Sequence, residues 1–429
     1  MGVSVAVVRV AANTSTGTQD ITTADLGGLT PKGAILIATR AVTSGTAADG
    51  AGWYVGFTDG TNHANMGYED LHGSETTLTL GSQDTTSPPV LIIYTGAATG
   101  TIDGSANFSA WITNGITIDW TDAPAAAYLI TAYLFAGSDL SAAALVATDV
   151  ANTVDNVTDI TSIGFEADVV ILGCNDPVAM ANQAGIHLGF IHNDRGGTVV
   201  QRAIAMSSRS GQTAGQARAT MHTNACAAVY LGNGSLDWYA EAGSFDSSGF
   251  SVTTRNAGAN GADLCGLALR FGASPVVSSK VYTYSTPTST GSNTDANPDF
   301  EPQFVMYLMT KTAVAATLET DADGGPVGVA TVDADGDVIT MTTAVDDAAL
   351  VTNTQSLSDT YLNFPTDDGS LTQEATLTSM GSTGPVWNWS GVDSSAARLW
   401  AGLAIGVFDA GGGTVVQDVI GGGIIPFAR

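Results

Sequence analysis

Short apolar runs bounded by Gly, Thr, Asn and Asp recur along this chain. The segment "GFEADVVILG" (164–173) is a polar start followed by a continuous apolar run, and "AILIAT" (34–39) is similar. Runs of this length that lack alternation predict central β-strands, covered on one side by a second sheet and on the other by another unit or a loop. The alternating segment "GITIDW" (115–120) instead predicts a strand with one buried and one solvated face.

The same pattern occurs three times. The segments "LTPKGAILIATRA" (29–41), "GFEADVVILG" and "FEPQFVMYLMTKTA" (300–313) align on Pro31, Ala167 and Pro302, which are 136 and 135 residues apart. The glycines of a later hairpin and of the closing strand keep offsets of 134 or 135 residues: Gly115, Gly249 and Gly384, then Gly137, Gly272 and Gly406. Because separate landmarks give one period, we infer an internal repeat of the size of a β-sandwich.

Each repeat follows one order of segments. A polar stretch comes first, at 15–22, 153–161 and 289–297, and its Thr, Ser, Asp and Asn content predicts turns. An apolar strand, a glycine-bearing strand, a hairpin and a final apolar strand follow. The hairpin is marked by "NG" (114–115) and "SG" (248–249), residue pairs that tolerate positive φ.

The repeats predict an all-β fold of three tandem antiparallel β-sandwich domains with jelly-roll-like wiring. Their boundaries are 1–139, 140–275 and 276–410, and a glycine-rich apolar tail follows at 411–429. The linkers are short, so we expect neighbouring domains to be in contact. The apolar residues of the tail predict that it packs on the body or on a partner.

Charge narrows the class of partner. The 429 residues include 41 acidic and 13 basic side chains, a formal net charge of −28. Such a surface repels phosphate backbones, which excludes nucleic acid as a partner, and it favours solubility in a salty medium. No apolar segment is long enough for membrane insertion. Arg9 interrupts the N-terminal apolar run, which lacks the layout of a signal peptide, so we expect synthesis in a cytoplasm.

No catalytic motif is present, and we predict that the protein is not an enzyme and needs no cofactor. The sequence lacks a nucleophile elbow, a zinc-protease helix motif and a phosphate-binding loop. The three cysteines show no metal-ligand spacing and are expected to be buried free thiols. His187 and His192, five residues apart on one strand, are expected to point to opposite faces. Most aspartates lie in Asp-Gly or Asp-Ala turns, where they bond their own backbone.

One acidic turn is weighed as a metal site. In "DADGD" (333–337), Asp333, Asp335 and Asp337 alternate as at the start of a Ca²⁺-binding loop. The EF-hand pattern fails, because Gly336 comes too early and Ala344 stands where a Glu is needed. The sequence favours a plain β-turn and leaves these three residues as a weak Ca²⁺ candidate.

Seven tryptophans offer either core packing or sugar-stacking platforms. A site shared by all repeats should recur at the repeat period. Trp120 does match Trp389, but the corresponding residue of the middle repeat is Thr254. Core packing is therefore favoured for most of them, and a single unrepeated glycan site stays open.

Taken together, the polar lead-in, the Leu/Phe-x-Pro/Ala strand entry, as at Pro31 and Pro302, and the "GFSVTT"-type hairpin (249–254) in an acidic Gly/Thr/Ala-rich chain resemble tandem β-sandwich virion structural proteins of tailed bacteriophages. These proteins occur as head decoration or cement proteins, tail-tip components and fibres. The resemblance implies a location in the virion after assembly in the host cytoplasm, with other capsid or tail proteins as partners, and self-association.

The resemblance leaves three functions to compare. The first is a non-enzymatic structural protein on the particle exterior, most directly a head decoration or cement protein. The alternative is a tail fibre or tail-tip protein that recognises a host-surface glycan through variable loops. The third is a polysaccharide-degrading enzyme, which would require a pair of carboxylates in one cleft.

Overall fold

The protein is built of antiparallel β-sheets, which confirms the predicted all-β sandwich-type fold. The structure is a computed structural model that describes residues 2–45, 48–49, 51–70, 89–94, 101–175, 183–209, 218–230, 236–258, 262–272, 277–313, 326–344, 354–365 and 371–407. Within these ranges the only helix is a single 3-10 turn, η1 (Ala24–Leu26). The predicted tail, 411–429, lies outside the described residues.

The first repeat contributes a larger and a smaller sheet. The larger sheet has the order β1 (Val3–Ala11), β10 (Leu129–Gly137), β3 (Gly33–Thr39), β5 (Ala51–Thr58), β6 (His63–Asp70). The smaller sheet has the order β2 (Gly17–Thr22), β9 (Gly115–Asp122), β8 (Ile102–Ile112), β7 (Leu91–Tyr94).

The other two repeats have the same strand order, and their larger sheets carry further strands at one edge. In the second, the larger sheet runs β11 (Leu140–Val150), β20 (Ala262–Phe271), β13 (Val169–Asn175), β14 (Gln183–Asn193), β15 (Val199–Arg209), β16 (Arg218–His222), and the smaller runs β12 (Val157–Ile160), β19 (Gly249–Asn256), β18 (Leu236–Asp246), β17 (Ala227–Tyr230). In the third, the larger sheet runs β21 (Val277–Ser285), β30 (Leu399–Val407), β23 (Phe304–Thr310), β24 (Val327–Asp333), β25 (Val338–Ala344), β26 (Thr354–Ser358), β4 (Ala48–Asp49), and the smaller runs β22 (Gly291–Thr294), β29 (Gly384–Gly391), β28 (Leu371–Gly381), β27 (Leu362–Pro365).

The repeats agree even in their irregularities. In the hairpin of each smaller sheet the register shifts at the same place, between Ser105 and Ala106, between Tyr239 and Ala240, and between Glu374 and Ala375. Bulges of this kind bend a strand and are specific features of a fold. The period found in the sequence is therefore also the period of the sheets, while the division into three domains stays a prediction.

The wiring is jelly-roll-like at the ends of each repeat and simpler in the middle. The last strand of the first repeat, β10, inserts between β1 and β3, and β9 pairs with β2, so the start and end of the repeat lie together in both sheets. The intervening strands form two meanders, β3-β5-β6 and β7-β8-β9. This arrangement makes each repeat a closed two-sheet unit.

The polar lead-in stretches, predicted to be turns, contain the edge strands β2, β12 and β22 of the smaller sheets. They were missed because each carries little apolar side chain: Ile21 is the one buried residue of β2, and Ile160 that of β12. The strands approach the hairpin glycines closely. A Cβ atom would lie within 2.1 Å of a lead-in carbonyl oxygen at Gly115 (Ile21), Gly249 (Ile160) and Gly384 (Asp295), which explains why these glycines recur.

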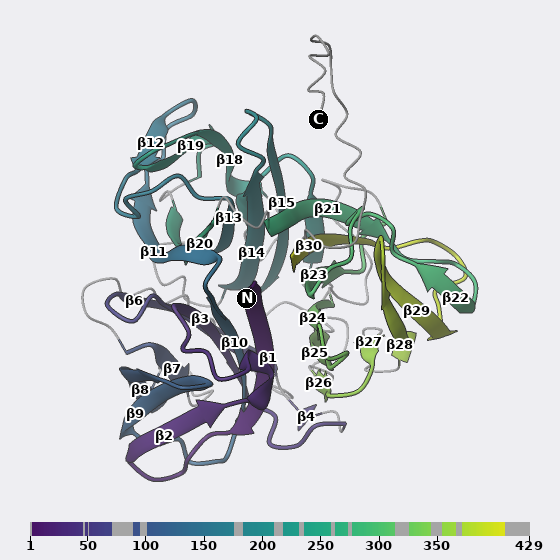
Figure 1. The fold of residues 1–429 in the computed structure, drawn as a ribbon, viewed down its shortest axis with the longest axis horizontal. Coiled ribbons are helices and arrows are strands. Elements are labelled where there is room, and N and C mark those ends of the chain that lie inside the picture. The colour runs from purple at the N-terminus through teal and green to yellow at the C-terminus, as the bar shows by residue number, and fades with distance from the viewer. Residues whose placement is uncertain are drawn as a thin grey trace, which may run out of the picture.

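The larger sheets are buried on both faces. In β3, Leu36 packs in the sandwich of the first repeat, whereas Ile35 and Ile37 belong to a cluster shared by all three repeats. The second and third repeats have sandwich clusters of their own and add residues such as Ile171 and Phe304 to the shared one. The prediction from non-alternating runs is confirmed, and the outer cover is the other two repeats. Figure 1 shows the three sheet pairs placed around this common centre.

Close contacts fill the shared core. The rings of Phe135 and Phe304 meet edge to face with centroids 6.3 Å apart, across the first and third repeats. Between the first and second repeats, a Cβ atom at Gly173 would lie 2.5 Å from the Met66 sulfur. Glycine at the end of "GFEADVVILG" therefore makes room for a neighbouring repeat.

The junction between the first and third repeats is closed without a linker. Strand β4, from a loop of the first repeat, extends the larger sheet of the third repeat by pairing with β26. Beside it, the Gly45 amide donates to the Leu357 carbonyl at 2.8 Å, and the Trp53 indole N–H donates to the Thr343 hydroxyl. The two chain-joined junctions need no such closure, because only two residues separate β10 from β11 and a short linker joins β20 to β21.

Arg9 supplies a positive charge at this closing junction. Its guanidinium donates to the carbonyl oxygens of Ser358, at 3.1 Å, and Thr340, at 3.0 Å, and pairs with the Asp359 carboxylate. The Arg9 side chain is 5% exposed and that of Asp359 is 45% exposed. The cation that interrupts the first apolar run thus satisfies buried carbonyls of the last repeat.

We predict that Arg9→Ala lowers the free energy of unfolding by about 2–5 kcal/mol, because it leaves two buried carbonyls without a donor. Asp359→Ala should cost less, about 1 kcal/mol, because the Asp359 carboxylate is 45% exposed and Arg9 keeps its bonds to the two carbonyls. Urea denaturation measures both, and equal losses in the two variants would contradict this account of the junction.

A second prediction concerns the shared core. Phe304→Ala should lower the free energy of unfolding by about 3–5 kcal/mol, and calorimetry should give one transition shifted as a whole, because the core joins all three repeats. Val157→Ala, at a side chain 55% exposed, is the control and should change stability by less than about 0.5 kcal/mol. Separate transitions, with only that of the third repeat shifted, would argue against a common core.

Candidate functional site

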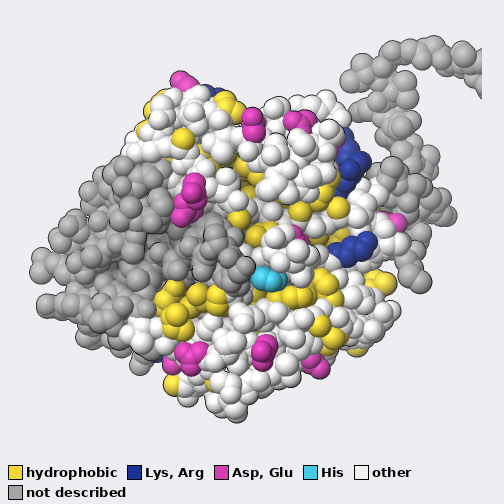
Figure 2. Space-filling model, turned by 90° about the vertical axis from the view of Figure 1, so that its left-hand side faces the viewer, with side chains coloured by type: hydrophobic (Ala, Val, Ile, Leu, Met, Phe, Trp, Pro, Cys, Tyr) yellow, Lys and Arg dark blue, Asp and Glu magenta, His cyan; other side chains and the backbone are white. Residues whose placement is uncertain are grey.

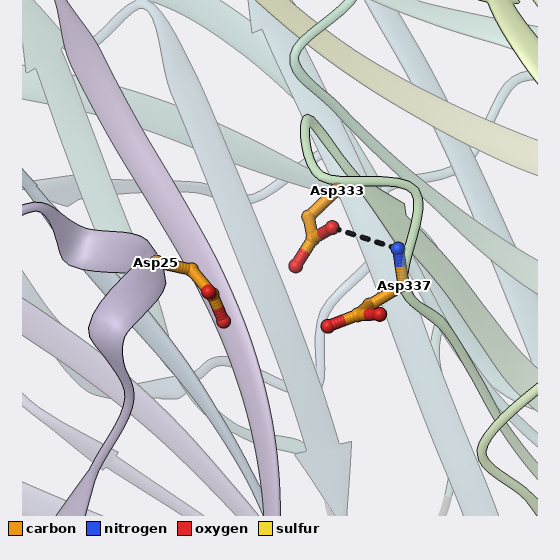
Figure 3. Close-up of side chains that lie close together, drawn as sticks. All are labelled: Asp25, Asp333 and Asp337. Carbon is orange, nitrogen blue, oxygen red and sulfur yellow. Dashed lines mark hydrogen bonds between the residues drawn. The ribbon is translucent and has the colours of Figure 1, made fainter.

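Three carboxylates from two distant parts of the chain meet at the closing junction (Figure 3). Asp25 lies in η1 of the first repeat, Asp333 ends β24, and Asp337 lies in the turn before β25 of the third repeat. One carboxylate oxygen from each lies within 4.8 Å of the others. We call these three residues the acidic cluster.

The third-repeat side of the acidic cluster is a tight turn. Gly336 adopts φ 87°, and its amide donates to the Asp333 carbonyl at 3.1 Å. The Asp337 amide donates to Asp333 Oδ1 at 3.0 Å. The turn predicted for "DADGD" is therefore present, and the aspartate at its start bonds its own loop, as the sequence analysis expects.

The first-repeat side is fixed by a helix cap. The Thr23 hydroxyl accepts from the Asp25 amide at 3.3 Å and donates to the Asp25 carboxylate. This capping interaction holds a half-buried carboxylate toward the third repeat. The Asp25 side chain is therefore held in place by contacts within the protein.

Asp333 is the unusual member of the acidic cluster. It is 2% exposed, and its Oδ2 atom is buried without a hydrogen-bond partner. Burial is the main cause that raises the pKa of Asp333 to about 6. The nearby carboxylates of Asp337, Asp25 and Asp335 act in the same direction, and the hydrogen bond from the Asp337 amide opposes them. A buried oxygen of this kind is costly unless a proton or a cation satisfies it.

Of the three residues weighed as a weak Ca²⁺ candidate, the structure brings Asp333 and Asp337 together and leaves Asp335 outside the cluster. The sequence analysis missed Asp25. No spacing rule could have found it, because such rules relate residues of one local segment, whereas Asp25 arrives from the first repeat.

The residue that occupies the position of Asp333 in the strand pairing lies at a boundary between repeats in all three repeats. Asp333 pairs with Phe304, and His192 pairs with the equivalent Val169. In the first repeat the equivalent residue is Asp59, which directly follows the last pair of β3 and β5, Ala34 with Thr58. Asp59 accepts a hydrogen bond from the Leu145 amide of the second repeat at 3.0 Å. His192 lines a hollow together with Val277 of the third repeat. The equivalent positions are thus occupied by chemically different side chains.

That hollow, of about 390 Å³, holds two carboxylates, those of Asp168 and Asp194. Asp168 is held by Arg195, whose guanidinium also donates to the Phe271 carbonyl at 2.9 Å. Burial alone would raise the pKa of Asp194, but hydrogen bonds from the Thr198 and Gly196 amides bring it below its usual value. A glycosidase general acid needs a raised pKa, so Asp194 does not fit that role.

The cysteines and two of the histidines lie in the interior. Cys174, Cys226 and Cys265 are buried free thiols, as predicted, and burial raises the pKa of Cys226 to about 12. His187 and His192 do point to opposite faces: His187 lies in the second repeat's sandwich, where its Nδ1 lies 3.2 Å from the Cys174 carbonyl oxygen. His72 lies outside the described residues.

His187 and His222 generate a pH prediction. Burial lowers the pKa of each to about 4. A folded-state pKa below the unfolded value means that the unfolded chain binds more protons between about pH 4 and 6.5, so stability falls as pH falls through this window.

Lowering the pH from 7 to 5 should therefore cost about 2 kcal/mol of unfolding free energy per buried histidine. His187→Gln and His222→Gln should each reduce this pH dependence, and His63→Gln, at a half-buried position, should reduce it less. Urea denaturation at both pH values is the measurement. Unchanged pH dependence in the first two variants would contradict the assignment.

The tryptophans are core residues. Six are at most 1% exposed: Trp53, Trp120, Trp238, Trp387, Trp389 and Trp400. The seventh, Trp111, is partly buried against the first repeat's sandwich cluster, where it packs edge-on against Phe108. The expectation of core packing for most of the tryptophans is confirmed.

Comparisons with protein-family models, with curated proteins and with solved structures found no match. No helix among the described residues is long and apolar enough to cross a membrane.

Proposed function

We propose that this protein is a non-enzymatic structural component on the exterior of a bacteriophage virion, most directly a head decoration or cement protein. The observation that carries the proposal is the arrangement of three like two-sheet repeats around one shared core. A single chain of this form has the shape of a trimer, and it suits a threefold or quasi-threefold position on a particle.

The packing supports a mechanical role. The larger sheets are covered on both faces, and the junction between the first and last repeats is closed by a shared strand and by Arg9. These contacts resist separation of the repeats. No disulfide contributes, since all three cysteines are buried free thiols.

The surface indicates what kind of contact a partner would make. Four large hydrophobic side chains of the described residues are exposed, namely Val42, Ile102, Val154 and Val157. The apolar faces between repeats are covered by the other repeats. Figure 2 shows acidic side chains scattered over one face and few basic ones. Other virion proteins would therefore meet a mainly polar, acidic surface, which also disfavours nucleic acid.

The rival functions have less support. A tail fibre or tail-tip protein that binds glycan would gain from exposed aromatic platforms, and six of the seven tryptophans are in the core. An enzyme would need a free pair of carboxylates, and those of the hollow near His192 are held by Arg195 and by backbone amides.

The test is to compare virions made with and without this gene product by cryo-electron microscopy, with complementation by the intact gene as the control. We expect density for a three-lobed body on the head of complemented particles and its loss from the deficient ones. An unchanged virion surface would contradict the proposal. Intact heads with lost host adsorption would favour the glycan-binding alternative instead.

A further inference from the structure

The acidic cluster lies at the one junction between repeats that no linker spans. Asp25 belongs to the first repeat, and Asp333 and Asp337 belong to the third. Strand β4 and Arg9 close the same junction. Three carboxylates that converge here would push the two repeats apart unless a positive charge lies between them.

We propose that the acidic cluster binds one Ca²⁺ ion that links the first repeat to the third. The proposal rests on more than the proximity of three carboxylates. Asp333 is 2% exposed, and its Oδ2 atom is buried without a hydrogen-bond partner. Figure 3 shows this oxygen on the side of Asp333 that faces the Asp25 and Asp337 carboxylates. A buried oxygen aimed at two further carboxylates is the arrangement that a bound cation would satisfy.

The ligand atoms select the metal. All three are carboxylate oxygens, and neither histidine nor cysteine belongs to the group, which disfavours zinc and other softer metals. Ca²⁺ accepts six to eight oxygen ligands in flexible geometry, so three carboxylates leave positions for water. Mg²⁺ demands a stricter octahedral geometry, which side chains from two separate repeats meet less readily. A site with few protein ligands should bind Ca²⁺ with a Kd of about 10⁻⁵–10⁻³ M.

The role of the ion at this site would be structural, because it would hold together carboxylates of two repeats. A bound Ca²⁺ would balance the charge of the buried Asp333 carboxylate and bridge it to the carboxylates of Asp25 and Asp337. The ion then adds a bond across the junction that β4 and Arg9 already close. The inference does not depend on the location of the protein in a virion, because it concerns only how the chain holds itself together.

The test is isothermal titration of CaCl₂ into the full chain after treatment with a chelator, near pH 7.5 in about 150 mM NaCl to screen diffuse attraction to the acidic surface. We expect one ion per chain. Asp25→Asn and Asp337→Asn should each weaken binding at least tenfold. Asp335→Asn, in the same turn but outside the acidic cluster, is the matched control and should bind within twofold of the natural protein.

Thermal unfolding gives a second measurement. Ca²⁺ at ~100 times its Kd should raise the melting temperature by about 2–3 °C in the natural protein and in Asp335→Asn. It should raise it by less than about 1 °C in Asp333→Asn, an isosteric change that keeps the fold. The proposed site would be overturned if Ca²⁺ showed no saturable binding, or if Asp25→Asn and Asp337→Asn bound Ca²⁺ as tightly as the natural protein. Mg²⁺ binding as tight as that of Ca²⁺ would overturn the choice of calcium.

Discussion

Apolar residues on both faces of the larger sheets dominate this structure. A strand such as β3 carries Leu36 toward one side and Ile35 and Ile37 toward the other. The smaller sheet of the same repeat covers only the first side, and the second would be exposed to water if a repeat stood alone. Three such sheets cover one another around a common centre, and the rest of the architecture follows from that requirement.

Closure of this arrangement concentrates polar chemistry at the edges of the shared core. Arg9, the β4–β26 pairing and the acidic cluster all lie where the first and last repeats meet without a chain connection. Inside the repeats, burial lowers the pKa of His187 and His222 and raises that of the cysteine thiols, so near pH 7 these groups are uncharged.

Much of the fold could be predicted from the sequence, because local pattern reports local burial. The runs "AILIAT" (34–39) and "DVVILG" (168–173) predicted strands covered on both faces, and they lie at the centre of the larger sheets. The cover itself could not be predicted, since an apolar face does not specify which surface it meets. The edge strands were missed because β2 buries only Ile21. Asp25 was missed because its partners arrive from the far end of the chain.

The equivalent boundary residues Asp59, His192 and Asp333 carry a further consequence. Three separate copies of one subunit would present identical contacts at every junction and could be rotated by a third of a turn without change. In this chain each junction between repeats has different side chains, so the three repeats around the shared core can be told apart. Any neighbour that recognises one lobe would therefore fix the angular orientation of the whole molecule.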